Sequence, residues 1–170
     1  FLMANVVLDS QDYHYSVSTR TIGGVTVYSN NYKESHIRSW LNDSFYNTAF
    51  STEEKARIQT TTVDNSVAST GYSSNPYASA NTSDKIFLLS YVEATSATYG
   101  LSTTTSRQLA PSAYAKAQGV DTSTNGSPWW LRSPHYIYDF LARDVYLDGD
   151  VYDYYNVRST CYGVVPALWI

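Results

Sequence analysis

Two apolar blocks enclose the last part of the chain: Trp129-Trp130-Leu131-Arg132-Ser133-Pro134 and Gly163-Val164-Val165-Pro166-Ala167-Leu168-Trp169-Ile170. We expect both blocks to form strands, because apolar runs bounded by turn residues are typical of buried strands. The intervening residues 135–162 differ in character, with seven tyrosines and five aspartates. This pattern predicts a binding surface that the core holds in place. The large apolar side chains that we place in that core are Trp129, Trp130, Leu131 and Trp169.

The bulk composition favours a single domain over residues 1–170 and excludes several functions. A chain of 170 residues can bury a substantial core without disulfides. The net charge of -4 offers no basic stripe with which to bind nucleic acid. The lone Cys161 excludes an intrachain disulfide and a zinc site with several cysteines. No apolar run approaches the roughly 18 residues of a membrane span, so we expect no direct membrane insertion.

Local patterns predict an α+β domain, with short helices in the first two-thirds of the chain and antiparallel strands in the last third. Ser51 and Glu54 form a capping-box pattern, and Pro111 and Gly119 bracket another helix. Loops are expected at 64–82 and 102–106. Helices are expected at 35–41, 45–50, 51–57, 91–97 and 111–118, and strands at 3–8, 13–17, 25–28, 58–63, 86–90, 129–132 and 164–170.

Residues 144–155 predict a β-hairpin, because Asp148-Gly149 is a strong signal for a tight turn between two strands. Successive side chains of a strand point to opposite faces. We therefore place Val145 and Val151 in the core. Tyr146, Asp150 and Tyr152 are expected on the exposed face.

Five motifs occur in order along the chain: IRSWLN at 37–42, FYNTAF at 45–50, DKIFLLS at 84–90, WWLRSP at 129–134 and PALW at 166–169. Together they resemble a family of bacterial and phage domains that are similar in fold to C-type lectins, in the branch that includes the formylglycine-generating enzymes. That branch contains the variable proteins of diversity-generating retroelements, which present randomised residues near their C-terminus to bind diverse ligands. The resemblance covers nearly the whole chain and implies a C-type-lectin-like fold.

Three positions or segments depart from the pattern of that family. His135 stands where Gly is usual, and Val165 stands where Arg is usual. The absence of this Arg removes an ion pair that could anchor the core or a loop. Residues 135–162 are filled with Tyr, Asp, Phe, Ile and Arg, where Asn, Ser and Ala are usual. His135 and the altered composition both fall in the segment where a diversified protein differs from its relatives.

The composition of residues 133–165 independently suggests diversification. This window has no Lys, Glu, Gln, Met or Trp, whereas residues 1–128 have four Lys, four Glu, four Gln, one Met and one Trp. A codon that ends in a pyrimidine cannot encode any of these five residue types. Adenine-directed mutagenesis of Asn codons would produce the residues that are present. The alternative is chance combined with the usual composition of β-hairpins.

We interpret residues 135–162 as a hypervariable ligand-binding segment. Tyrosine offers a large rigid contact area with a polar tip, and Asp, Asn and Ser offer adaptable hydrogen bonding, as in antibody loops. For any one tyrosine, the alternative is that it pairs across strands and only stabilises the sheet. The predicted ligand-binding residues are His135, Tyr136, Tyr138, Asp139, Phe140, Arg143, Asp144, Tyr146, Asp150, Tyr152, Asp153, Tyr154, Tyr155, Asn156 and Arg158.

The sequence does not favour an enzyme or a bound cofactor. The formylglycine-generating relatives hold their metal with a pair of cysteines, which Cys161 alone cannot supply. No serine lies in a Gly-x-Ser-x-Gly motif. We expect no cofactor, and the alternative is calcium, because several aspartates with hard oxygen ligands are close in sequence. Their spacing does not fit the helix-loop-helix calcium loop, and the Glu-Pro-Asn sugar-binding motif of calcium-dependent lectins is absent. The candidate calcium ligands are Asp144, Asp148, Asp150 and Asp153.

We therefore expect a non-enzymatic ligand-binding protein, of the receptor or adhesion type, with a diversified C-terminal surface. Its partner would be a protein or a glycan, and its location extracellular, on a cell surface or on a phage particle. The alternative is a fixed glycan- or protein-binding module of a larger secreted bacterial protein. A degenerate oxidoreductase is a third, less favoured hypothesis.

Overall fold

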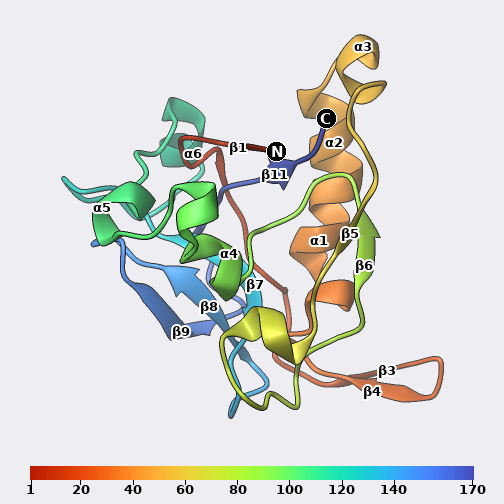
Figure 1. The fold of residues 1–170 in the computed structure, drawn as a ribbon. Coiled ribbons are helices and arrows are strands. Elements are labelled where there is room, and N and C mark those ends of the chain that lie inside the picture. The colour runs from red at the N-terminus through yellow and green to blue at the C-terminus, as the bar shows by residue number, and fades with distance from the viewer.

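The computed structural model describes residues 1–170 and confirms the expected α+β class (Figure 1). Its main sheet has five strands in the order β2-β10-β7-β8-β9. Only the β10–β7 pair is parallel. β9 therefore forms one edge of the sheet, and β7 lies at its centre. The strands are β2 Asp9–Ser10, β10 Gly163–Val164, β7 Trp129–Pro134, β8 Leu141–Val145 and β9 Val151–Asn156.

Three two-stranded ladders complete the strands. β1 (Leu2–Met3) pairs with β11 (Ala167–Leu168), so the two ends of the chain lie side by side (Figure 1). β5 (Thr61–Val63) pairs with β6 (Thr82–Asp84), and the expected 64–82 loop connects them. β3 (Arg20–Ile22) and β4 (Val25–Val27) form a hairpin that projects from the body of the molecule (Figure 1).

The first helices form one continuous rod where two separate helices were expected. η1 (Tyr32–Glu34) precedes α1 (His36–Trp40), which Ser35 caps by accepting the Arg38 N–H. A π-helical turn, η2 (Leu41–Phe45), continues directly into α2 (Tyr46–Ala49). Ile37, Leu41 and Tyr46 face the core and are buried, and the π-helical turn accounts for the five-residue step from Leu41 to Tyr46. The Ser51–Glu54 capping box is confirmed and opens α3 (Thr52–Lys55).

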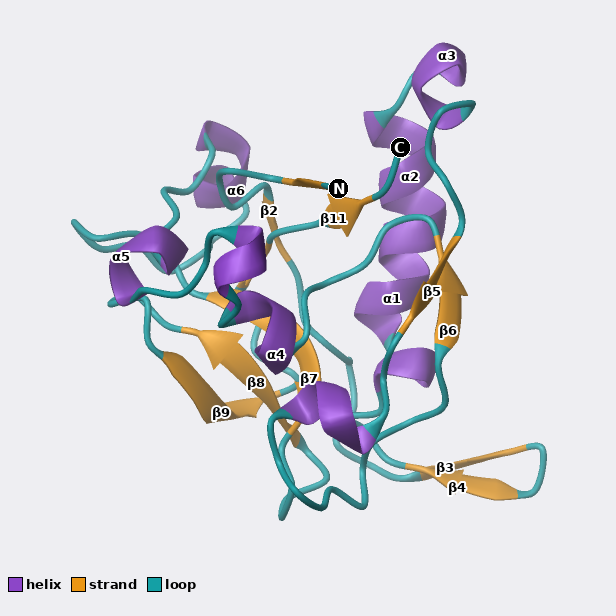
Figure 2. Cartoon of the chain, viewed as in Figure 1, coloured by secondary structure: helices purple, strands orange, loops and turns teal.

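Five short helices lie in the middle of the chain, and the connections between them are mainly loops (Figure 2). Two of these helices, η3 and α5, fall in segments expected to be loops. α5 forms because Thr103 and Ser106 cap it reciprocally, which offsets the low helix propensity of its Thr and Ser residues. The helices are η3 Val67–Thr70, α4 Tyr91–Ala94, η4 Ala97–Tyr99, α5 Thr104–Arg107 and α6 Ala113–Ala117.

Three expected strands are largely absent, and a fourth is divided. Of residues 3–8, only Met3 belongs to a strand, and Val7 forms an isolated bridge to Pro111. Residues 13–17 form no ladder, because the segment crosses the core as a coil that buries Tyr13 and His14. Residues 86–90 are buried as expected, but only Phe87 forms a bridge, to Ala167. The closing strand divides between β10 and β11 because Pro166 has no N–H with which to continue a ladder.

The predicted core is confirmed at β7 and wrong at the last tryptophan. Trp129, Trp130 and Leu131 are fully buried, and the Trp130 indole N–H donates to the Gln11 carbonyl at 2.9 Å. Trp169 is 37% exposed. It follows β11 at the rim of the molecule, where its ring packs against Phe1 and not into the core.

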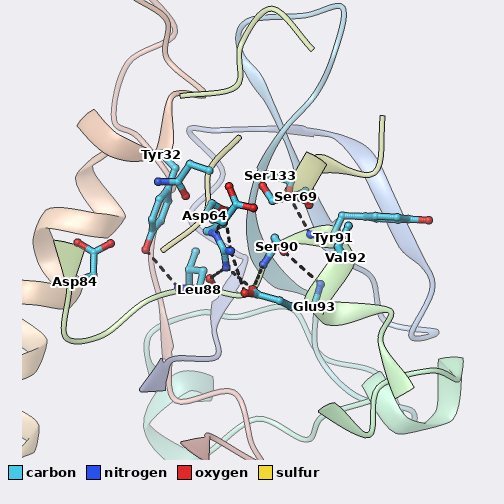
Figure 3. Close-up of polar contacts among 12 residues, drawn as sticks. Tyr32, Asp64, Ser69, Asp84, Leu88, Ser90, Tyr91, Val92, Glu93 and Ser133 are labelled. Carbon is cyan, nitrogen blue, oxygen red and sulfur yellow. Dashed lines mark hydrogen bonds and ion pairs between the residues drawn. The ribbon is translucent and has the colours of Figure 1, made fainter. Parts of the chain in front are cut away.

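Arg132, at the centre of β7, ties several segments together through buried polar contacts. Its guanidinium donates to the Leu88 carbonyl at 2.7 Å and to the Asp64 carbonyl at 2.9 Å. It also forms a two-point ion pair with Glu93 of α4. The Glu93 carboxylate accepts the Ser90 N–H in turn, at 2.8 Å (Figure 3). Strand, loop and helix are thus held at one point.

Replacing Trp130 by alanine is expected to cost about 3–5 kcal/mol of unfolding free energy, because the ring is fully buried against Tyr13 and Tyr162. Trp169→Ala is the matched control and should cost markedly less, since that ring is partly in solvent. Chemical denaturation of the three proteins measures both values. Equal losses for the two variants would contradict the burial described above.

Candidate ligand-binding surface

Residues 135–158 present a largely aromatic and acidic surface from a loop and a hairpin. The loop, residues 135–140, connects β7 to β8, and the hairpin consists of β8 and β9. Tyr136, Ile137, Tyr138 and Tyr154 are the large side chains most exposed here, at 41%, 52%, 50% and 55%. We call the following exposed and half-buried residues the display surface: Tyr136, Ile137, Tyr138, Asp139, Phe140, Tyr146, Asp148, Asp150, Tyr152, Asp153, Tyr154, Asn156 and Arg158.

The loop is held through its main chain by polar residues from elsewhere in the fold. The buried Asn30 side chain donates to the Tyr138 and Leu141 carbonyls, at 3.0 Å each. The buried Ser29 hydroxyl donates to the Asp139 carbonyl at 2.7 Å. Further bonds of the same kind run from Asn75 to the Pro134 carbonyl and from Tyr77 to the Ile137 carbonyl. These contacts fix the path of the loop and leave its side chains free.

His135 supports this loop from within and is not displayed, contrary to the prediction. Its ring is buried, and Nδ1 accepts the N–H groups of Ile137 and Tyr138 at 2.8 and 3.0 Å. The proton of the neutral ring therefore lies on Nε2, 3.9 Å from Asp153 Oδ2. Burial lowers the pKa of His135, and the Asp153 carboxylate opposes this shift.

The tip of the hairpin is also held through its main chain. The buried Arg107 of α5 donates to the Gly149 carbonyl at 2.7 Å, and Gln108 donates to the Asp148 carbonyl at 2.8 Å. Gly149 has φ +83°, and a Cβ there would lie 2.0 Å from the Thr104 carbonyl oxygen. Only glycine fits this position. The turn predicted at Asp148-Gly149 is confirmed.

A β-bulge changes which residues of β9 face solvent. Ala142 lies opposite Tyr155 and Asp144 lies opposite Tyr152, so two steps along β8 correspond to three along β9. As a result, Tyr155 packs against Tyr162 with a ring-centroid distance of 3.9 Å and is only partly exposed. Much of the Tyr155 ring therefore belongs to the core and not to the display surface.

The hairpin side chains otherwise divide as expected, with some differences of degree. Val145 is fully buried, whereas Val151 is half-buried against the core. Asp150 is exposed as predicted, but Tyr146 and Tyr152 are half-buried because their rings pack edge-to-face at 5.8 Å. Each ring of this edge-to-face pair contacts its neighbour across the strands and is also partly exposed to solvent.

Two predicted ligand-binding residues of β8, Arg143 and Asp144, are buried. Arg143 lies between the rings of Tyr72 and Tyr91, 4.3 and 4.1 Å from their centroids. Asp144 is fully buried on the opposite face of β8, and neither carboxylate oxygen has a hydrogen-bond partner. Burial raises the pKa of Asp144 to about 8, and the nearby Tyr162 hydroxyl opposes this rise only in part. The Asp144 carboxyl is therefore not available to a ligand.

Sequence reasoning missed the aromatic residues that the 64–82 loop and α4 contribute to this surface. The Tyr72 ring packs against Tyr136 at 4.4 Å, and its hydroxyl donates to the Asp153 carboxylate. Tyr91 completes the stack around Arg143. Two isolated tyrosines among Ser, Asn and Gly residues are the only signal in that loop. Ile137 lies within residues 135–162 but is not among the predicted ligand-binding residues.

The structure does not bring the candidate calcium ligands together. Asp144 is buried, Asp148 and Asp150 lie at the exposed hairpin turn, and Asp153 bonds to Tyr72. No three His, Cys, Asp or Glu side chains are grouped so as to hold a metal ion. None of the helices is long and apolar enough to cross a membrane.

The fold and this surface define a small α+β domain in which a rigid core presents a tyrosine-rich loop and hairpin. The chain belongs to the family described as a domain of unknown function, DUF6273, whose model matches residues 2–170. No curated protein and no solved structure matches the chain.

Two adjacent tyrosines of β9 should respond differently to replacement by alanine. Tyr155→Ala is expected to cost about 2–4 kcal/mol, because the ring packs against Tyr162 and Trp130. Tyr154→Ala should change stability by no more than about 0.5 kcal/mol, because the side chain is 55% exposed. Thermal and chemical unfolding of both variants test this. A large loss for Tyr154→Ala would place that ring in the core.

The buried Asp144 should make the protein less stable as pH rises. Its folded pKa of about 8 exceeds the ordinary value of 3.8, so the folded state holds an extra proton between these values. The resulting stabilisation is complete below about pH 4 and is lost toward pH 8, by up to about 1.4 kcal/mol per pH unit. Asp144→Asn should remove this slope from denaturation curves. The exposed Asp150→Asn is the control and should keep the slope; an unchanged slope in Asp144→Asn would contradict the assignment.

Proposed function

We propose that this domain is a non-enzymatic ligand-binding protein with a C-type-lectin-like fold, whose display surface is diversified by retroelement mutagenesis. The ligand would be a protein or a glycan, with an identity that differs between copies of the domain. The setting would be extracellular, on a cell surface or on a phage particle. The five sequence motifs that support this fold lie in the helical rod, the 84–90 segment, β7 and the C-terminal strand, all outside the display surface.

The observation that carries the proposal is that polar side chains of the scaffold hold the main chain of the variable segment. Ser29, Asn30 and Tyr77 bond to carbonyl oxygens within residues 137–141, and Asn75 bonds to that of Pro134 just before the loop. Arg107 and Gln108 bond to carbonyl oxygens of the hairpin turn. A carbonyl oxygen is present whatever the side chain is. The segment can therefore change most of its side chains and keep its path.

The composition of the surface supports the same proposal. Exposed tyrosines and aspartates provide the rigid aromatic contacts and adaptable hydrogen bonds of a binding loop. The window from 133 to 165 also contains only residues that pyrimidine-ending codons can encode. A fixed binding module would explain the exposed tyrosines but would not require this restriction.

The DNA beside the gene tests the diversification directly. We expect a near-identical copy of the segment that encodes the last part of the domain, differing from it mainly at adenines, together with a reverse transcriptase. The differences should fall on codons of the display surface and spare those of Gly149 and Trp130. A fully sequenced neighbourhood without such a copy, combined with a reproducible hit on a glycan array, would favour a fixed glycan-binding module.

Changing several display positions at once should leave the fold intact. Replacing Tyr136, Ile137, Tyr138 and Tyr154 by Asn is expected to alter the unfolding free energy by less than about 2 kcal/mol, because each side chain is largely exposed. The single control Asn30→Ala should cost about 1–3 kcal/mol, because it removes both hydrogen bonds that the buried Asn30 amide donates to the Tyr138 and Leu141 carbonyls. Circular dichroism and denaturation compare the two proteins. Unfolding of the fourfold variant would show that these side chains have structural roles.

A further inference from the structure

Three buried arginines line or support the display surface, and one of them differs from the others. Arg107 donates to the Gly149 and Leu101 carbonyls. Arg132 donates to two carbonyls and to Glu93. Arg143 is equally buried, at 7% exposure, but makes no hydrogen bond or ion pair within the protein, and its Nε is enclosed without a partner. Because a buried charge without partners is costly, this exception requires an explanation.

The position of Arg143 is fixed by two aromatic rings that are themselves held in place. Tyr91, the first residue of α4, donates its N–H to the Ser133 hydroxyl at 2.9 Å (Figure 3). Gly71 lets the ring approach closely, since a Cβ there would lie 2.1 Å from Tyr91 Cδ1. Tyr72 is held by Asp153 and by Tyr136. The guanidinium is thus pre-organised before any ligand is present.

This stacking satisfies the faces of the guanidinium but not its edge. Cation–π contacts stabilise a cation between two rings and use none of its N–H donors. The two Nη atoms are neither hydrogen-bonded nor fully enclosed, so they remain the donors that a ligand can reach. The neighbouring Tyr136 is exposed and its ring packs against Tyr72, so the display surface borders the aromatic pair that holds Arg143.

We propose that Arg143 is a pre-organised anchor for a single carboxylate group of the ligand. This inference rests on the proposed ligand-binding function and names the chemistry that one point of the surface recognises. The planar edge of a guanidinium matches a carboxylate with two parallel hydrogen bonds. A carboxylate would also supply the charge that no residue of the chain pairs with Arg143.

The charge of the surroundings favours one carboxylate over a multiply charged anion. Asp139, Asp148, Asp150 and Asp153 belong to the display surface, whereas Arg158 is its only exposed cation. A phosphate chain or nucleic acid would meet repulsion from these aspartates. A single carboxylate meets much less, because its one charge is neutralised where it binds.

Nuclear magnetic resonance on the whole domain, with isotope-labelled arginine, tests this proposal. The side-chain signal of each arginine reports directly whether a ligand binds there. The probes are acetate, inorganic phosphate and neutral acetamide, followed by N-acetylglutamate methylamide and glucuronate to separate protein from sugar sources of the carboxylate. We expect a saturable shift of the Arg143 signal with acetate and no shift with acetamide. Arg143→Gln assigns the signal, and exposed Arg158 is the internal control.

The Tyr91→Leu variant tests the role of the stacking, and its Arg143 signal should saturate only at higher acetate concentration. The proposal is overturned if acetate shifts Arg143 no more than Arg158, or if phosphate saturates Arg143 at lower concentration than acetate. The proposed function would survive either result, since it depends on the neighbouring DNA and on the anchored main chain. Conversely, a fixed binding module could still use Arg143 in this way.

Discussion

The ion pair between the buried Arg132 and the partly exposed Glu93 is the contact on which the arrangement of the display surface depends. Removing two charges from water is expensive unless hydrogen bonds satisfy every donor and acceptor. Here the Asp64 and Leu88 carbonyls and the Ser90 N–H complete the set. The pair thereby fixes β7 against the start of the 64–82 loop and against the continuous stretch from Leu88 to Glu93. Residues 133–135 follow Arg132 directly, so this contact also positions the start of the loop that carries Tyr136.

In residues 135–158 the main chain is held by the scaffold, while most of the side chains are presented to solvent. The scaffold binds carbonyl oxygens of the segment through Asn30, Ser29 and Arg107, and the surface presents side chains outward. Two aromatic residues of the scaffold, Tyr72 and Tyr91, also contribute to the surface, because they hold Arg143 between their rings. Residues 135–158 and the preceding part of the chain therefore build the surface jointly.

Features that depend on local signals could be predicted from the sequence. The Asp148-Gly149 turn, the Ser51–Glu54 capping box and the buried strand at Trp129 each follow from a few adjacent residues. The burial of Arg143, Asp144 and His135 could not be predicted in this way. The contacts of Arg143 depend on Tyr72 and Tyr91, which are far away in sequence. The packing of Tyr155 into the core depends on a bulge in β9 that a regular alternation does not anticipate.

The hairpin is fixed at its tip as well as at its base, since Gly149 packs against the Thr104 carbonyl oxygen while the strands continue the central sheet. An inserted or deleted residue would move the tip away from α5 or shift the strand register, and a shift by one residue exchanges the two faces. The length of the hairpin is therefore constrained at both ends, and substitutions change the side chains that it presents without changing its reach.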